Sequence, residues 1–363
     1  MDRIPLSVLS TIDPVLRETA IFGLLVDSPR TVVLRHDILA ERGGLRRVVL
    51  DRDGVLEDVL VELEHACLSC AVREDALPAP RDLAADGRWD DVVLALPVGA
   101  ESLPATLALS AAMHPGTVCE RLRLAAVCAL VDLDATEEDL LGIDSLAERD
   151  LALTDDDERA VAEVLAAQLG HADVVVACGG PVARTEPGPR TRRGSELIDH
   201  LRAPDSQRLD GIHELGAERL VAVHHDPCVG ERRCDPRHVH VRRSAGQVWS
   251  MELTSTRPFH PERLLERIEE LGTGPVRSRG VFWLPNRPDS VCQWDGAGGQ
   301  LYIGELGTWD DAAFTRLVFT GVDPRERERI RRVFDEVLAR EDEVADGGLA
   351  WLGREDVLAP WLG

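Results

Sequence analysis

Two kinds of hydrophobic pattern alternate over the first 200 residues. Short runs rich in β-branched residues are separated by longer segments whose apolar residues recur at helical spacing. This alternation is typical of βα units that build a parallel sheet. We expect strands at residues 6–9, 31–34, 47–50, 92–96, 123–130 and 173–177, and helices at residues 15–25 and 156–169. The pattern therefore predicts a doubly wound, mostly parallel α/β sheet, with Thr154 capping the second helix.

The pattern changes after a stretch rich in proline, glycine and arginine at residues 184–208, which predicts a loop around a short helix at 197–201. Beyond it, strands are expected at residues 239–241, 248–253, 281–284 and 300–303, and helices at residues 261–271 and 324–339. This order predicts a smaller α+β domain. We therefore expect a first domain at 1–210, a junction at 211–238 and a second domain at 239–363.

The charge balance excludes some partners. The chain has 363 residues, 65 acidic and 41 basic, and a net charge of −24. Naked nucleic acid and anionic lipid are disfavoured, whereas a basic protein partner is favoured. Every basic residue is arginine, so chemistry that needs a lysine ammonium is excluded.

The number of cysteines and the length of the apolar runs indicate the cellular compartment of the protein. Eight cysteines in a chain of this length are too sparse for a disulfide-stapled secreted domain. The first ten residues contain no apolar leader, and no apolar run approaches the roughly 18 residues that cross a bilayer. We expect a cytoplasmic protein without a membrane segment.

Two sets of residues resemble one known family. Residues 66–75 read Ala-Cys-Leu-Ser-Cys-Ala-Val-Arg-Glu-Asp and resemble the Gly-Cys-x-Cys-Cys-x-x-Arg-x-Asp segment of the CobW-like P-loop GTPases, a metallochaperone family. The segments Thr-Arg-Pro-Phe-His-Pro-Glu-Arg at 256–263, Gly-Val-Phe-Trp-Leu at 280–284 and Phe-Thr-Gly-Val-Asp at 319–323 resemble the CobW C-terminal domain. The resemblance implies a P-loop-like sheet, GTP hydrolysis and zinc handling. One branch of the family also implies a ribosome-associated or hibernation-factor partner.

The nucleotide motifs of that family are missing from this sequence. A P-loop needs glycines, a lysine and a serine or threonine, yet the pattern falls on Thr11, Leu16, Arg17 and Glu18. The family's Glu-Thr-Thr-Gly and Asn-Lys-x-Asp segments are replaced by residues 96–99 and by Cys-Gly-Gly-Pro at 178–181. The sequence therefore predicts a pseudo-GTPase with no catalytic residues and no bound GTP. Arg17 is expected either as a solvated side chain or as a phosphate contact.

Cys67 and Cys70 form a Cys-x-x-Cys pair, and His65 precedes them. Two thiolates and an imidazole suit zinc, but Ser69 replaces the family's middle cysteine, so two buried reduced cysteines remain the alternative. A second group could gather a metal or form a polar junction: His224, His225, Cys228, Cys234, His238 and His240. His260, before a predicted helix, is expected to be structural.

Two functions follow from these residues. The first is a non-catalytic interaction protein of the CobW-like type that acts in zinc homeostasis or in recruiting a hibernation factor. The alternative is a zinc metallochaperone that binds and hydrolyses GTP.

Overall fold

A computed structural model describes residues 3–39, 42–65, 67–179, 187–242, 246–345, 351, 354 and 356–363. The chain divides into two compact units. The first comprises Met1–Thr136 and Asp144–Cys234, and the second comprises Glu137–Ile143 and Asp235–Gly363. The segment expected as a junction is thus shared, since 211–234 falls in the first unit and 235–238 in the second. Among the described residues, no helix has the length and apolar character needed to cross a membrane.

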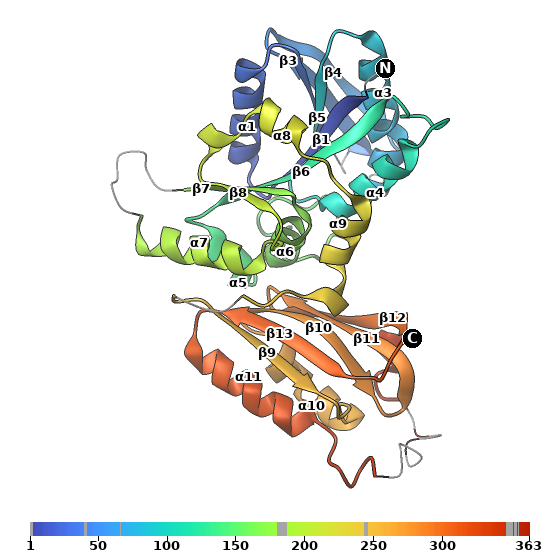
Figure 1. Ribbon diagram of the computed structural model, residues 1–363, viewed down its shortest axis with the longest axis vertical. Helices are drawn as coiled ribbons and strands as arrows, with labels where there is room; N and C mark the ends of the chain where they lie inside the picture. The colour runs from blue at the N-terminus through green and yellow to red at the C-terminus, as the bar shows by residue number, and fades with distance from the viewer. Residues whose placement is uncertain are drawn as a thin grey trace. The chain divides into compact units, whose positions relative to one another are not determined.

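An eight-stranded sheet forms the centre of the first unit (Figure 1), with the order β4-β3-β2-β5-β1-β6-β7-β8. Strand β3 runs antiparallel to β2 and β4, and the remaining pairs are parallel. The strands are β1 (Ile4–Ser10), β2 (Thr31–Leu39), β3 (Gly44–Asp51), β4 (Gly54–Glu62), β5 (Asp91–Ala95), β6 (Leu122–Asp132), β7 (Val174–Cys178) and β8 (Gln207–Leu209).

Helices cover both faces of this sheet because alternate strand residues point to opposite sides. One core joins the sheet to η2, α3 and α4, and another joins it to α1 and α8. The helical elements are α1 (Pro14–Asp27), α2 (Leu68–Ala71), η2 (Val72–Ala76), α3 (Pro78–Asp86), α4 (Ser102–Ala112), α5 (Thr136–Leu141), α6 (Val161–His171), α7 (Pro189–Leu201), η3 (Ile212–Glu214), α8 (Ala217–Ala222) and α9 (Pro227–Cys234). The doubly wound α/β class predicted from the sequence is confirmed.

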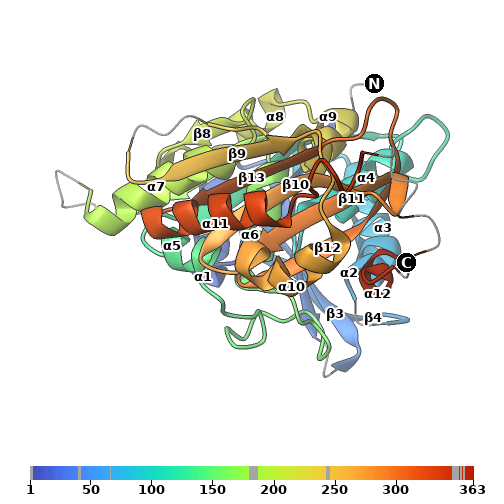
Figure 2. The same ribbon diagram turned by 90° about the horizontal axis from the view of Figure 1, so that it is seen from below.

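The second unit contains a five-stranded antiparallel sheet of order β12-β11-β10-β13-β9. Helices α10 and α11 lie side by side against one face of it (Figures 1 and 2), where Leu264 and Phe334 pack among the strand aromatics. His260 caps α10, since its Nδ1 accepts a hydrogen bond from the Arg263 N–H at 3.5 Å, which confirms a structural role. The elements are η4 (Pro236–His238), β9 (Trp249–Ser255), α10 (Pro261–Gly272), β10 (Val276–Leu284), β11 (Arg287–Ala297), β12 (Gln300–Thr308), β13 (Thr315–Gly321), α11 (Pro324–Val337) and α12 (Ala359–Leu362).

One predicted strand was wrong, and two predicted helices have different bounds. Residues 239–241 form no strand, although Val239 is held by a hydrogen bond from Arg316. Helix α6 begins at Val161 rather than near Thr154, because the Asp157 N–H closes a turn on the Thr154 carbonyl oxygen at 3.2 Å and Ala160 pairs with Ser145 in an isolated β-bridge. The predicted loop of 184–208 contains α7, a helix of 13 residues, and the short strand β8. Residues 184–186 of that stretch lie outside the described residues.

Helix α7 packs so closely on the end of β6 that only glycine fits at position 194. A Cβ atom there would lie 2.0 Å from the carbonyl oxygen of Leu133. We expect Gly194→Ala to reduce the free energy of unfolding by about 2 kcal/mol, measured by urea unfolding followed by circular dichroism. Gly170→Ala in α6 is the matched control, because nothing lies within 4 Å and a helical alanine gains up to ~1 kcal/mol. Equal effects of the two substitutions would contradict this packing.

Candidate functional site

The loop between β1 and α1 occupies the position of a P-loop, and the backbone N–H groups from Asp13 to Arg17 are already bonded within the chain. Asp13 N–H donates to Thr11 Oγ1 at 3.0 Å. The N–H groups of Val15 and Leu16 donate to Asp13 Oδ1 at 2.7 and 3.0 Å, and Arg17 N–H donates to the Asp13 carbonyl oxygen at 3.1 Å. An internal carboxylate therefore occupies the anion position at the start of α1, where a P-loop protein binds phosphate.

Arg17, at the position of the P-loop lysine, is 6% exposed rather than solvated as one expectation had it. Its Nη1 donates to the carbonyl oxygens of His36 and Leu96, both at 3.3 Å. Its Nη2 lies 2.6 Å from Asp37 Oδ1, and its Nε lies 3.3 Å from Glu18 Oε1. A buried guanidinium needs such partners because an unpaired buried charge is costly. The cation is thus used in holding β2 and the end of β5 against α1.

The segment after β5, where the family motif has Glu-Thr-Thr-Gly, supports the same loop. Gly99 N–H donates to the Thr11 carbonyl oxygen at 3.0 Å. Gly99 has a φ of +80°, and a Cβ there would lie 2.9 Å from the Leu151 carbonyl oxygen. Glycine is therefore required for backbone packing at this position. Of the expected base-reading segment, residues 180 and 181 lie outside the described residues.

The structure brings together His65, Cys67 and Cys70 on one short turn after β4. Cys70 Sγ lies 4.0 Å from His65 Nδ1, close to the roughly 3.6 Å that separates sulfur and nitrogen ligands of a tetrahedral zinc ion. The Cys70 N–H lies 3.5 Å from Cys67 Sγ. Cys70 is buried, Cys67 is half-buried and His65 is exposed, so the group reaches solvent on one side. The donor set therefore suits zinc.

This turn is not a finished metal cage. Within the described ranges, no group of three or more histidine, cysteine, aspartate or glutamate side chains is already placed to hold an ion. Glu64, which precedes His65, donates its backbone N–H to Glu74 Oε2 at 3.1 Å. Binding of an ion by all three residues would therefore require their side chains to rotate.

A buried carboxylate that the sequence did not single out anchors this turn. Asp75 is 1% exposed and lies in η2, directly after the cysteines. Its Oδ2 lies 2.7 Å from His36 Nε2, and its Oδ1 lies 2.5 Å from Arg47 Nη1. Asp75 ends the motif that carries the family resemblance, but nothing in the sequence links it to a histidine 39 residues away.

Two family profiles match this chain. The CobW/HypB/UreG nucleotide-binding domain matches residues 37–178, and the cobalamin synthesis protein cobW C-terminal domain matches residues 248–338. The chain belongs to the CobW family. The nucleotide-domain match begins within β2, so the loop between β1 and α1 lies outside it.

CobW-family relatives are named for zinc. A Mycobacterium tuberculosis protein named zinc chaperone is 29% identical over 302 residues, which cover 79% of this chain and 70% of that protein. The zinc-regulated GTPase metalloprotein activator 1 of Dictyostelium discoideum is 25% identical over 69% of this chain and 55% of that protein. Two crystal structures of the Zn(II)-bound YjiA GTPase from E. coli, one a triple mutant, are 15% identical and cover 93% of this chain and 99% of theirs, with TM-scores of 0.37 and 0.36.

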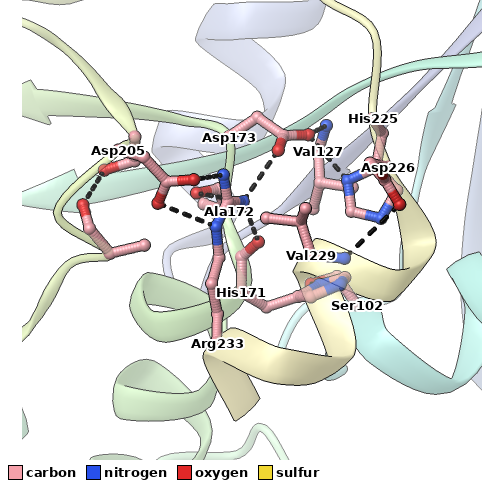
Figure 3. A network of polar contacts seen from close by, with 12 residues as sticks. Ser102, Val127, His171, Ala172, Asp173, Asp205, His225, Asp226, Val229 and Arg233 are labelled. Carbon is pink, nitrogen blue, oxygen red and sulfur yellow. Dashed lines mark hydrogen bonds and ion pairs between the residues drawn. The ribbon is translucent and has the colours of Figure 1, made fainter. Parts of the chain in front are cut away.

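The second expected metal cluster of this CobW-family chain is partly a buried ion-pair network (Figure 3). His225 Nδ1 lies 2.8 Å from Asp173 Oδ2, and Arg233 Nη1 lies 2.8 Å from Asp173 Oδ1. Arg233 also pairs with Asp205 at 2.8 Å. Burial alone would raise the pKa of Asp173, but His225, the Val127 N–H and Arg233 together lower it. The network holds α9 against the rest of the first unit.

The other expected members of that cluster are not gathered by this network. His224 and Cys228 are exposed, and Cys234 is half-buried at the end of α9. His238 and His240 fall in the second unit, where His238 lies 3.3 Å from Asp235.

His171 is held neutral inside this network. Its Nδ1 lies 2.8 Å from Ser102 Oγ, and its ring meets that of His225 edge-on at 5.2 Å. The Nε2 atoms of His171 and His225 each lie within about 3 Å of the point that a Cβ at Gly230 would occupy, so glycine is required there. Burial, followed by the neighbouring His225, lowers the pKa of His171 to about 3.

The pKa of His171 predicts a pH-dependent stability. At His171 the unfolded chain binds a proton below about pH 6.5, whereas the folded chain does not until about pH 3. The contribution of His171 to stability therefore decreases as the pH falls through this window, by up to ~1.4 kcal/mol per pH unit, while Asp91, whose pKa is raised to about 6, contributes in the opposite direction. The lowered pKa of Asp173 adds a loss only below about pH 4. We expect His171→Gln to remove this contribution. The free energy of unfolding, measured with urea, should then decrease less from pH 6.5 to pH 4.5 than in the wild type. The exposed His114→Gln should leave the wild-type slope, and parallel slopes in all three proteins would refute the assignment.

Proposed function

We propose that this CobW-family protein handles zinc, with Cys67, Cys70 and His65 as the ligands. The observation that carries the proposal is the approach of the Cys70 sulfur to His65 Nδ1 at 4.0 Å, on a turn that also holds Cys67. The names of the relatives, a zinc chaperone and a zinc-regulated GTPase, support the choice of metal.

Three ligands on a partly exposed turn suit a transferable ion. A closed structural zinc site uses four protein ligands, whereas a three-ligand site leaves one position for water or for the ligand of an acceptor. Zinc is then cargo, bound when both thiols lose their protons and the imidazole is neutral. Its affinity should therefore decrease as pH falls.

Zinc affinity tests the ligand set directly. We expect Cys67→Ser and Cys70→Ser each to weaken zinc binding on the order of a hundredfold. The binding free energy of a four-ligand zinc site is ~10–16 kcal/mol, so each ligand contributes ~3 kcal/mol. The measurement is competition with a chromophoric chelator at pH 6, 7 and 8, and wild-type affinity should rise with pH. Cys228→Ser, which removes an exposed thiol in α9, is the control. Wild-type affinity in the Cys67→Ser/Cys70→Ser double variant would place the zinc elsewhere.

We further propose that zinc handling proceeds without GTP in the β1–α1 loop, so that the chain acts as a pseudo-GTPase. The loop N–H groups that would face phosphates donate to Thr11 and Asp13, and Arg17 pairs with carboxylates. The competing proposal is a zinc metallochaperone that hydrolyses GTP. It is favoured by the match to a nucleotide-binding domain over residues 37–178 and by the names of two relatives, a zinc chaperone and a zinc-regulated GTPase, and it requires other residues to hold the nucleotide.

Calorimetry with GTP and Mg²⁺ separates these two proposals. We expect no binding at micromolar concentrations and no hydrolysis. GTP at a thousand times its dissociation constant would add about 4 kcal/mol of stability, so a thermal-shift assay gives an independent reading. Asp13→Gly is an informative comparison, because it releases the Val15 and Leu16 N–H groups. Micromolar GTP affinity in the wild type would refute the proposal.

A partner class completes the proposal. The net charge of −24 favours association with a basic protein, and the family resemblance suggests a ribosome-associated protein or a hibernation factor. This partner stays a prediction.

A further inference from the structure

Strand β2 connects the start of α1 to the cysteine turn through two successive residues. Asp37 and the carbonyl oxygen of His36 contact Arg17, which belongs to α1. The His36 side chain points to the opposite face of the sheet, where it contacts Asp75 of η2. The alternation of side chains along a strand explains this arrangement, because neighbouring residues face opposite sides. A continuous set of polar contacts therefore crosses the sheet.

The members of this set are buried, so their partners are required. Arg17 is 6% exposed, and His36 and Asp75 are each 1% exposed. Removing one member leaves a buried charge or polar group without its partner, which is costly. Arg47 closes the set at its far end, where it pairs with both Asp75 and Glu57. These contacts hold β2, β3 and η2 in one arrangement.

Asp75 and the cysteines share one short helical segment. Helix α2, which contains Cys70, continues directly into η2, which contains Asp75. The Ala71 N–H donates to the Cys67 carbonyl oxygen at 3.0 Å, and the Leu77 N–H donates to the Val72 carbonyl oxygen at 3.1 Å. A shift of the carboxylate would therefore move the sulfur atoms that precede it.

We infer that Arg17, His36 and Asp75 are positioning residues for the zinc turn. Arg17 supplies a permanent cation, at the end of the sheet where a P-loop protein holds phosphates, and fixes β2 from one side. His36 and Asp75 transmit that constraint to the cysteine turn on the other side. Zinc affinity in this chain is consequently supported by an internal side chain and needs no nucleotide. The inference rests on the proposed zinc function.

Arg35 provides a matched control for Arg17. It pairs with the same two carboxylates, at 2.9 Å to Glu18 and 3.2 Å to Asp37. Its side chain lies on the α1 face of β2, together with that of Asp37. We expect Arg17→Gln to weaken zinc binding about tenfold, in the range found when residues that orient metal ligands are changed. Arg35→Gln should change it less than about twofold.

Double substitution tests whether the contacts act as one unit. Asp75→Asn should also weaken zinc binding about tenfold, and Arg17→Gln/Asp75→Asn should be no more than slightly weaker than either single variant. Arg17→Lys keeps the charge beside Asp37 and should restore part of the affinity, which guards against a variant that fails to fold. Additive losses, or an Arg17→Gln affinity within twofold of wild type, would overturn the inference.

Hydrogen exchange provides a readout that does not depend on zinc. Amide exchange at residues 67–77 should accelerate in Arg17→Gln and not in Arg35→Gln, with circular dichroism confirming that both remain folded. If zinc does not bind Cys67 and Cys70, the proposed function fails, yet this comparison still shows whether Arg17 positions the turn. Unchanged exchange in Arg17→Gln would overturn the positioning role by itself.

Discussion

The need to pair every buried guanidinium organises the first unit. The chain has no lysine, so each internal cation is an arginine whose planar group can donate to several acceptors at once. Arg17 joins α1 to β2 and to the end of β5, while Arg47 joins β3 to β4 and η2. Arg233 joins α9 to the residue that precedes β7. Each arginine fixes the relative position of the elements it joins, because its hydrogen bonds are directional. Dispersion and apolar burial are not.

The start of α1 shows how the chain itself meets the electrostatic requirement of a helix N-terminus. A helix N-terminus has unpaired N–H groups and a partial positive charge, and both favour an anion. Asp13 supplies that anion from within the chain, and Thr11 Oγ1 accepts the Asp13 N–H. The carboxylate thereby stabilises the first turn of α1 without an external anion.

Hydrophobic periodicity predicted the parallel strands because they form nearly continuous apolar runs. It missed β4, whose residues are mostly exposed, as well as β11 and β13, whose apolar runs are only two or three residues long. The Cys-x-x-Cys spacing placed Cys67 and Cys70 on one turn, which local geometry dictates. The pairing of His36 with Asp75 could not be predicted, since it depends on which residues of β2 face η2. A local sequence pattern does not show which distant residues face each other in the folded chain.

The cysteine turn combines a fixed side and an open side, and exchange of an ion requires both. Asp75 secures the turn from within the core, so little conformational entropy is lost when the ligands gather. His65 lies exposed at the other side, where an incoming ligand can displace it or occupy the fourth position. A turn buried on all sides would bind zinc tightly and release it slowly, whereas a turn without an anchor would pay the ordering cost at each binding event. The arrangement seen here lies between these limits, which fits the proposed role as a carrier of zinc.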